Sequence, residues 1–171
     1  MIRESQCRRY DLTEMAFTSH PSLEGYTGFL LRRIGHATFE RFAPATAAYG
    51  LHPMHFGMLN VLESDSPIAQ HELARRTGVD PSSMVARMDV LEEQGMVERR
   101  RRPDDRRAYE IRLTDRGRET LTELRTVAAG ITADLMGPLD EPERKTLHEL
   151  LLRVAAGMDE RDGAVPGPGS D

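Results

Sequence analysis

The residues best suited to chemistry in this chain are arginines, and they are concentrated in one short stretch. From Met96 to Arg118 the sequence holds nine arginines and five acidic residues, a formal charge of about +4. The whole chain carries −5, so the remainder is strongly acidic. Guanidinium groups bind phosphate and carboxylate oxygens in bidentate fashion, so this local excess indicates an anionic partner. A solvated charged face is the alternative, and the flanking elements decide between the two.

Other reactive side chains are sparse. Cys7 is the only cysteine, so neither an intrachain disulfide nor a cysteine zinc finger can form. Its thiol is an ordinary group or, alternatively, a redox sensor activated by neighbouring arginines. His52 and His55 could suggest a metal pair, but Pro53 intervenes and no nearby carboxylate completes a site. With no nucleophile elbow, phosphate-binding loop or paired acid motif, we expect no enzyme activity, no metal and no cofactor.

Length and composition favour one compact domain with extensions. The chain has 171 residues, of which 39% are hydrophobic and 30% charged. No stretch approaches the roughly 18 apolar residues of a membrane span, and the N-terminal residues lack an apolar signal core. We therefore expect a cytoplasmic protein without a membrane partner.

The centre of the chain has the pattern of two short helices joined by a tight turn and followed by a hairpin. Gly78 lies in the turn, and Asp80 is placed to cap the second helix with Pro81 at its first position. The expected elements are helices over 53–63, 70–76 and 81–94, a very short strand at Ile68, and strands over 96–101 and 108–113 with a tip at 103–105.

Longer amphipathic helices flank this centre. The first begins at Ser22 and should end or kink at Pro44. After a cap at Thr114, apolar residues from Leu121 to Leu135 recur every three or four positions, a seam suited to a partner helix. These stripes exceed what a small domain can cover, so a second copy of the chain is expected. The last helix starts at Asp140, and its stripe is Leu147, Leu150, Leu151, Val154 and Met158.

Two helices around a tight turn form a helix-turn-helix, and the hairpin makes it a winged one. The second helix would fit the major groove of DNA with its N-terminal end toward the bases. Met84, Met88 and Leu91 take the inward arc. The outward arc, which would contact DNA, holds Ser82, Ser83, Val85 and Ala86.

The same stretch resembles the MarR family of bacterial transcriptional regulators. The most specific feature is the spacing of Asp105-x-Arg107 from Leu113-Thr114-x-x-Gly117, and the likeness covers roughly residues 23–158. It implies a mainly α fold with a small β-hairpin wing, and an obligate homodimer on a palindromic operator. The other matching segments are Leu73-Ala74, Gly78-Val79, Leu91 to Arg99 and Pro103 to Arg107.

The resemblance assigns roles to single residues. Arg107 matches the wing-tip arginine that enters the minor groove, and Asp105 matches the acid that holds the wing in shape. A guanidinium suits the negative potential of a narrow minor groove, and a carboxylate can orient it. Further phosphate contacts are expected from Gln70, His71, Arg99, Arg100, Arg101, Arg102 and Arg106.

Two positions depart from the family pattern. His52 replaces a common capping threonine, so poor capping of the following helix is expected. Arg87 falls on the inward arc, where relatives place an apolar residue, and a buried guanidinium requires a partner. It snorkels to an acid or phosphate, or it faces the cleft where the family binds effectors, together with Arg32 and His36. The second alternative predicts a small, anionic aromatic effector.

The sequence therefore predicts a dimeric DNA-binding regulator, of repressor type, that an effector releases from its operator. The alternatives are a redox regulator acting through Cys7 and a protein-interaction module that has lost DNA binding. The expected organisation is an N-terminal extension over 1–21, a dimerisation and effector-cleft helix over 22–50, a winged helix-turn-helix over 51–113, dimerisation helices over 114–160 and a disordered tail over 161–171.

Overall fold

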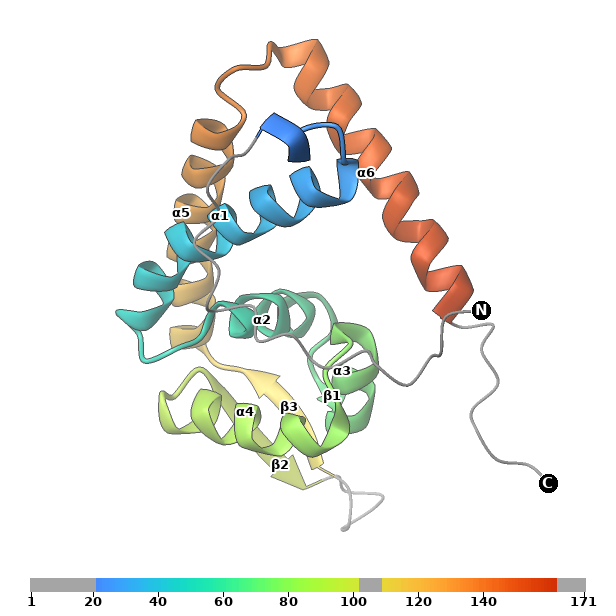
Figure 1. Cartoon of the computed structure of the whole chain (residues 1–171). Coiled ribbons are helices and arrows are strands. Elements are labelled where there is room, and N and C mark those ends of the chain that lie inside the picture. The colour runs from blue at the N-terminus through green and yellow to red at the C-terminus, as the bar shows by residue number, and fades with distance from the viewer. Residues whose placement is uncertain (1–20, 102–108, 163–171) are drawn as a thin grey trace, which may run out of the picture.

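The computed structural model describes residues 21–101 and 109–162, and the chain there is mainly helical. Within these residues, three short strands form one antiparallel sheet in the order β1-β3-β2. In Figure 1 the sheet and helices α2, α3 and α4 form a lower body, above which lie α1, α5 and α6. The predicted fold class, mainly α with a small β-hairpin, is confirmed.

The lower body is a helix-turn-helix followed by a hairpin. The hairpin register pairs Val97 with Leu113 and Arg101 with Tyr109, and β1 pairs with the opposite edge of β3. Each predicted element is present, with ends within two residues of the expected ones. The elements are α2 (Pro53–Asp65), β1 (Ile68–Ala69), α3 (Gln70–Thr77), α4 (Pro81–Glu93), β2 (Val97–Arg101) and β3 (Tyr109–Leu113).

An apolar core lies between the three helices and the sheet. Met84, Met88 and Leu91 turn one face of α4 into this core, as the spacing predicts. Burial of a side chain of this size contributes about 1.5–3 kcal/mol, so this face fixes how α4 sits on the body. Also fully buried in this core are Met58, Leu59, Leu62, Leu73, Met96, Ile111 and Leu121.

The first turn of α5 (Asp115–Leu135) lies against the start of β2. Thr114 caps α5 by accepting a hydrogen bond from the Gly117 N–H at 3.0 Å, and its hydroxyl donates to the Gly95 carbonyl at 2.7 Å. A Cβ on Gly117 would lie 2.3 Å from the carbonyl oxygen of Met96. Glycine at this position therefore allows the helix and the strand to approach.

Two histidines cap the N-terminus of α2. The His52 Nδ1 accepts a hydrogen bond from the Met54 N–H at 3.2 Å, and the His55 Nδ1 accepts one from the His52 N–H at 3.0 Å. The expectation of poor capping at His52 is wrong, because a neutral imidazole nitrogen accepts as a threonine oxygen would. The Phe39 ring packs on His52 with centroids 5.4 Å apart.

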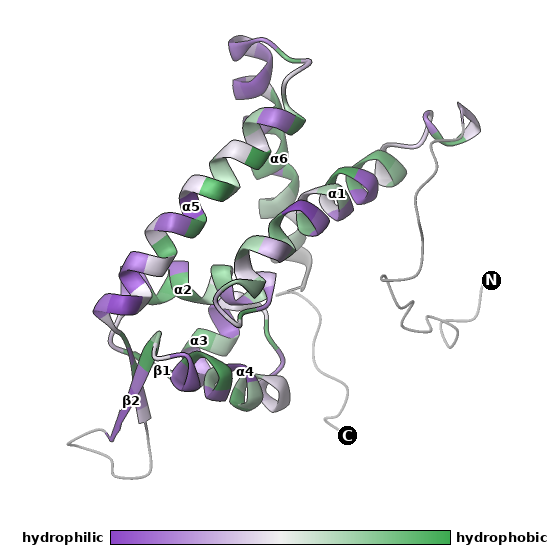
Figure 2. Ribbon diagram, turned by 90° about the vertical axis from the view of Figure 1, so that its left-hand side faces the viewer, coloured by the Kyte–Doolittle hydropathy of each residue, from purple (hydrophilic) through white to green (hydrophobic). Residues whose placement is uncertain are grey.

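Helices α1 (Thr27–Ala47), α5 and α6 (Glu141–Asp162) form the upper part of the chain. The Arg125 side chain of α5 donates to Asn60 Oδ1 at 2.7 and 3.0 Å and pairs with Glu63, which fastens α5 to α2. Figure 1 shows α6 standing apart from the lower body, and no side chain described on it is buried. Hydrophobic residues along these long helices are visible in Figure 2.

Three expected boundaries are wrong. The first helix begins at Thr27, after a 3₁₀ turn over Pro21–Leu23, rather than at Ser22. The helix does not end at Pro44: this residue lies inside α1, which continues to Ala47, since the fixed φ of proline is compatible with a helix although its N–H donor is missing. Residues 161 and 162, expected to belong to the disordered tail, are the last two of α6, and the rest of the expected tail lies outside the described residues. None of the helices over the described residues has the length and apolar character needed to cross a bilayer.

Candidate nucleic-acid interface

The first turn of α4 is open to solvent, and Asp80 organises it. Its carboxylate accepts hydrogen bonds from the Ser82 hydroxyl and from the Ser83 N–H and hydroxyl, the last two at 3.2 and 3.3 Å. These donors, the Ser82 hydroxyl foremost, hold the pKa of Asp80 below its ordinary value. Val85 is 49% exposed and Ala86 is exposed beside it. The structure thus brings the four predicted contact residues of α4 onto one accessible face.

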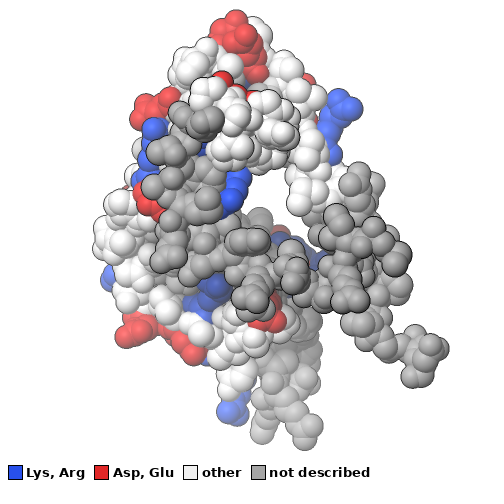
Figure 3. Space-filling view, in the orientation of Figure 1, with Lys and Arg blue, Asp and Glu red and all other residues white. Residues whose placement is uncertain are grey.

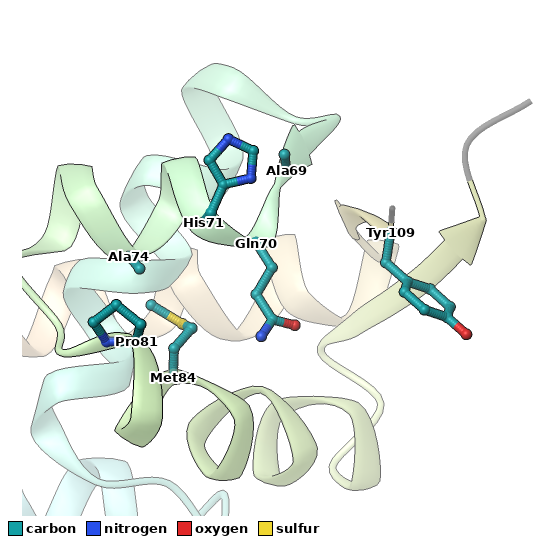
Figure 4. Close-up of a pocket in the computed structure, with 7 residues that line it drawn as sticks. All are labelled: Ala69, Gln70, His71, Ala74, Pro81, Met84 and Tyr109. Carbon is teal, nitrogen blue, oxygen red and sulfur yellow. The ribbon is translucent and has the colours of Figure 1, made fainter. Parts of the chain in front are cut away.

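The start of α3 borders this face across a shallow hollow of 320 Å³. Figure 4 shows the Gln70 amide directed toward α4, whereas the His71 ring is turned away from it. Both predicted phosphate contacts on α3 line this hollow, and the Gln70 side chain is the one that points toward α4. The hollow is lined by Ala69, Gln70, His71, Ala74, Pro81, Met84 and Tyr109.

Tyr109 is a surface residue at the start of β3. Its alternation with Ile111 and Leu113 predicts three buried side chains, but Tyr109 is 41% exposed because it lies at that end of the strand, beyond the core. The Arg101 Nε donates to its hydroxyl at 3.3 Å, and the guanidinium carbon lies 5.9 Å from the ring centroid. A guanidinium and a phenol are therefore paired at the base of the wing.

In the basic stretch from Met96 to Arg118, which we call the arginine ridge, the described arginines are largely paired with acids. The Arg99 Nη2 lies 2.5 Å from Asp89 Oδ1, and the Arg100 Nη2 lies 2.8 Å from Glu98 Oε1. Figure 3 shows both basic and acidic side chains on the part of the lower body visible in that view. Arg100 and Arg101 are exposed, as phosphate contacts require, whereas the Arg99 side chain is turned onto α4.

The wing tip lies outside the described residues. Arg102, Asp105, Arg106 and Arg107 are all in this segment, and Cys7 lies outside the described residues as well. Their expected roles therefore stay predictions from the sequence.

Arg87 on α4 is close enough to His55 on α2 for its charge to act on the imidazole. The Nε atom of Arg87 is buried and has no hydrogen-bond partner among the described residues. The pKa of His55 is lowered to about 4, first because the imidazole is buried, then by the positive charge of Arg87 and by the neighbouring His52. On α1, Arg32 is exposed and His36 half-buried, each with interactions of its own. The sequence pattern did not identify His55 as the neighbour of Arg87.

The depressed pKa of His55 makes folding stability depend on pH. The unfolded chain takes up a proton near pH 6.5 and the folded chain only near pH 4, so stability is full above about 6.5 and falls as the pH drops toward 4. We expect a loss of about 1 kcal/mol between pH 7 and 5.5, measured by urea unfolding. The matched variant is His55→Gln, which keeps an acceptor for the His52 N–H but does not titrate. An equal pH dependence in this variant would contradict the assignment to His55.

The arrangement defines a class of protein. A helix-turn-helix whose second helix presents an open first turn, followed directly by an arginine-rich antiparallel hairpin, is the winged helix-turn-helix of DNA-binding proteins.

Comparisons with known proteins agree with this class. Residues 49–108 match the sequence model of the MarR family. A protein of Thauera aromatica described as a candidate transcriptional regulator of the hcr operon is 36% identical over 145 residues, 84% of this chain and 86% of that protein. The transcriptional repressor CouR, solved on a 23-mer DNA duplex, has a TM-score of 0.71 and 31% identity over 82% of this chain and 99% of its own. CouR bound to p-coumaroyl-CoA gives a TM-score of 0.68 and 28% identity over 81% and 98%.

The chain belongs to the MarR family of transcriptional regulators.

Proposed function

We propose that this protein is a homodimeric repressor that binds a pseudopalindromic operator of about 16–20 base pairs, with half-sites about one helical turn apart. The observation that carries the proposal is the open first turn of α4 beside a basic hairpin. Similarity to CouR, a repressor solved on DNA, supports it. The activity is binding without catalysis or cofactor, and its DNA partner implies a cytoplasmic location.

The homodimer is inferred from the apolar surface of the long helices. On α6, Leu152 and Val154 are each 57% exposed and Met158 is 59% exposed. Leu31 and Ile34 on α1 are 45% and 44% exposed. Exposed apolar side chains repeated along α6, with further ones on α1, are the kind of surface that proteins cover with a partner. A second copy supplies the complementary helices. The two winged helix-turn-helix bodies of the dimer, which we call the reading bodies, are then related by the two-fold symmetry that a palindrome also has.

The interface residues divide into two groups. The first turn of α4 reaches base edges, where Val85 and Ala86 contact thymine methyl groups and the serines contact bases or phosphates. Arg107, oriented by Asp105, enters the minor groove. The phosphates are bound by Gln70, His71, Arg100, Arg101, Arg102 and Arg106.

Arg107→Ala tests the proposed function. We expect several-fold to hundredfold weaker operator binding in a gel shift at fixed salt, because one good groove contact contributes about 1–3 kcal/mol. The matched control is Arg106→Ala, which should weaken operator and scrambled duplexes alike, since a phosphate contact carries no sequence information. Unchanged operator affinity in Arg107→Ala would contradict the wing assignment.

The effector is proposed to be a small aromatic anion held by Arg32, His36 and Arg87. The unpaired, buried Arg87 Nε carries this part of the proposal, because it is a donor that a carboxylate or phosphate oxygen could satisfy. The p-coumaroyl-CoA ligand of CouR is likewise aromatic and anionic. Effector binding would shift the population of dimers toward a spacing of reading bodies that does not fit the operator.

Calorimetric titration with phenolic acids and their coenzyme A thioesters tests the effector site. We expect binding to the wild type that Arg87→Ala weakens at least tenfold. Arg118→Ala on α5 is a control of the same residue type, since its guanidinium is exposed and pairs with Asp115. Equal or absent binding in wild type and Arg87→Ala would overturn the assignment.

A further inference from the structure

Arg99 occupies the middle of β2, but its side chain lies on α4. Its Nη2 is 2.5 Å from Asp89 Oδ1 and 3.5 Å from the Val85 carbonyl oxygen, and its Nε is 3.5 Å from Glu92 Oε2. The backbone N–H of Arg99 also donates to Glu92 Oε1 at 3.3 Å. The side chain is only 21% exposed, far less than the 59% of the neighbouring Arg100. Arg99 is therefore committed to α4 and not presented to solvent.

These contacts join the two DNA-reading elements of the body. One side of α4 carries Val85, Asp89 and Glu92 in succession. A single guanidinium therefore contacts residues spread over nearly two helical turns. Strand β2 is an edge strand that pairs only with β3, and in this pairing Arg99 lies opposite the fully buried Ile111. We call the contacts of Arg99 with Val85, Asp89 and Glu92 the Arg99 clamp. Because the clamp bridges this edge strand and α4, it connects the base of the wing to the recognition helix.

The clamp also changes the charge that α4 presents. Asp89 and Glu92 are 59% and 43% exposed on the helix that reads DNA, where free carboxylates would repel phosphates. Arg99 compensates one of the two negative charges and holds both side chains against β2. Without it, two acids would stand beside the bound duplex.

We propose that Arg99 is a positioning residue for sequence-specific DNA binding, and not a phosphate ligand. It fixes the angle between α4 and the wing, so that base contacts from α4 and the minor-groove contact from the wing are made together. This inference rests on the proposed function, in which α4 and the wing read adjacent grooves. Preference for operator over unrelated DNA should therefore depend on Arg99 more than affinity for DNA in general does.

The test measures binding to an operator duplex selected with the wild type and to a scrambled duplex over a salt series. For Arg99→Gln we expect at least tenfold weaker operator binding, a smaller ratio of operator to scrambled affinity, and a salt slope equal to that of the wild type. A slope reduced by about 0.9, the loss of one phosphate contact, together with an unchanged ratio would overturn the proposal. Arg99→Lys keeps the positive charge but loses the planar guanidinium. Its operator affinity should therefore lie between those of the wild type and Arg99→Gln.

The double variant Asp89→Asn/Glu92→Gln provides a second arm that leaves Arg99 in place. Releasing the guanidinium should let it reach phosphates, which steepens the salt slope by about 0.9 and lowers the operator ratio. An unchanged salt slope and an unchanged ratio of operator to scrambled affinity in the double variant would contradict the clamp. This result can be used even where Arg99→Gln fails to fold. A wild type without any operator preference would instead refute the proposed function. The clamp would then be judged by the coupling of Arg99 to Asp89 and Glu92 in urea unfolding, which should be absent if the proposal is wrong.

Discussion

Gly117→Ala should destabilise the protein by about 3 kcal/mol, a large loss for the addition of a single methyl group. The added Cβ would lie 2.3 Å from the Met96 carbonyl oxygen and 2.7 Å from Leu113 Cδ1. The first obstacle is backbone that also accepts the Thr114 hydroxyl and N–H, so it cannot move without breaking the cap of α5. Relief of the clash would have to separate α5 from β2.

Urea unfolding and thermal melting measure this loss, which corresponds to a melting temperature lower by about 10 °C for a chain of this size. The matched control is Gly57→Ala on α2, where a new Cβ meets nothing within 4 Å. Alanine favours a helix over glycine, so the control should be neutral or more stable by up to about 1 kcal/mol. Equal stability of Gly117→Ala and the wild type would show that α5 and β2 do not approach as described.

Local signals in the sequence were sufficient for most of the fold. Asp80 followed by Pro81 predicted the start of α4, and Thr114 predicted the start of α5; both side chains accept the expected backbone N–H hydrogen bonds. Such caps depend on residues within one turn, so they can be interpreted without knowing the tertiary structure. Pro44 shows the limit, because the local rule that proline ends a helix does not hold there and α1 continues to Ala47.

The candidate site was harder to predict, because its charged side chains pair with residues on other helices and strands, and these pairs form only when the chain is folded. From the sequence alone, Arg99 is expected to be one of several phosphate contacts. Side chains alternate between the two faces of a strand, however, so Arg99 lies on the same inward face of β2 as the buried Val97. Asp89 and Glu92 lie one turn apart on α4, a pairing that only the packing of β2 on that helix creates. Arg87 was identified by its place on the inward arc, but its neighbour His55 belongs to another helix.

Paired substitutions of Leu150 and Val154 by aspartate should convert the dimer into a monomer and weaken operator binding at least a hundredfold. The two residues lie one turn apart on α6 and are 49% and 57% exposed in the single chain. Their burial against a second copy would make two new carboxylates costly to accommodate. A monomer loses the link between half-sites, and avidity of this kind contributes roughly 10²- to 10⁴-fold.

Sedimentation velocity at micromolar concentration reports the assembly state, and fluorescence anisotropy on the operator reports the affinity. The matched control places two aspartates on the opposite side of α6, at Lys145 and His148, which should leave a dimer with little loss of affinity. Because no side chain described on α6 is buried within one chain, its apolar stripe has no intrachain role that the Leu150 and Val154 changes could disturb. Dissociation without loss of folding, seen by an unchanged helical signal in circular dichroism, is therefore the expected result. A dimer that persists in the Leu150 and Val154 variant would show that the second copy docks elsewhere.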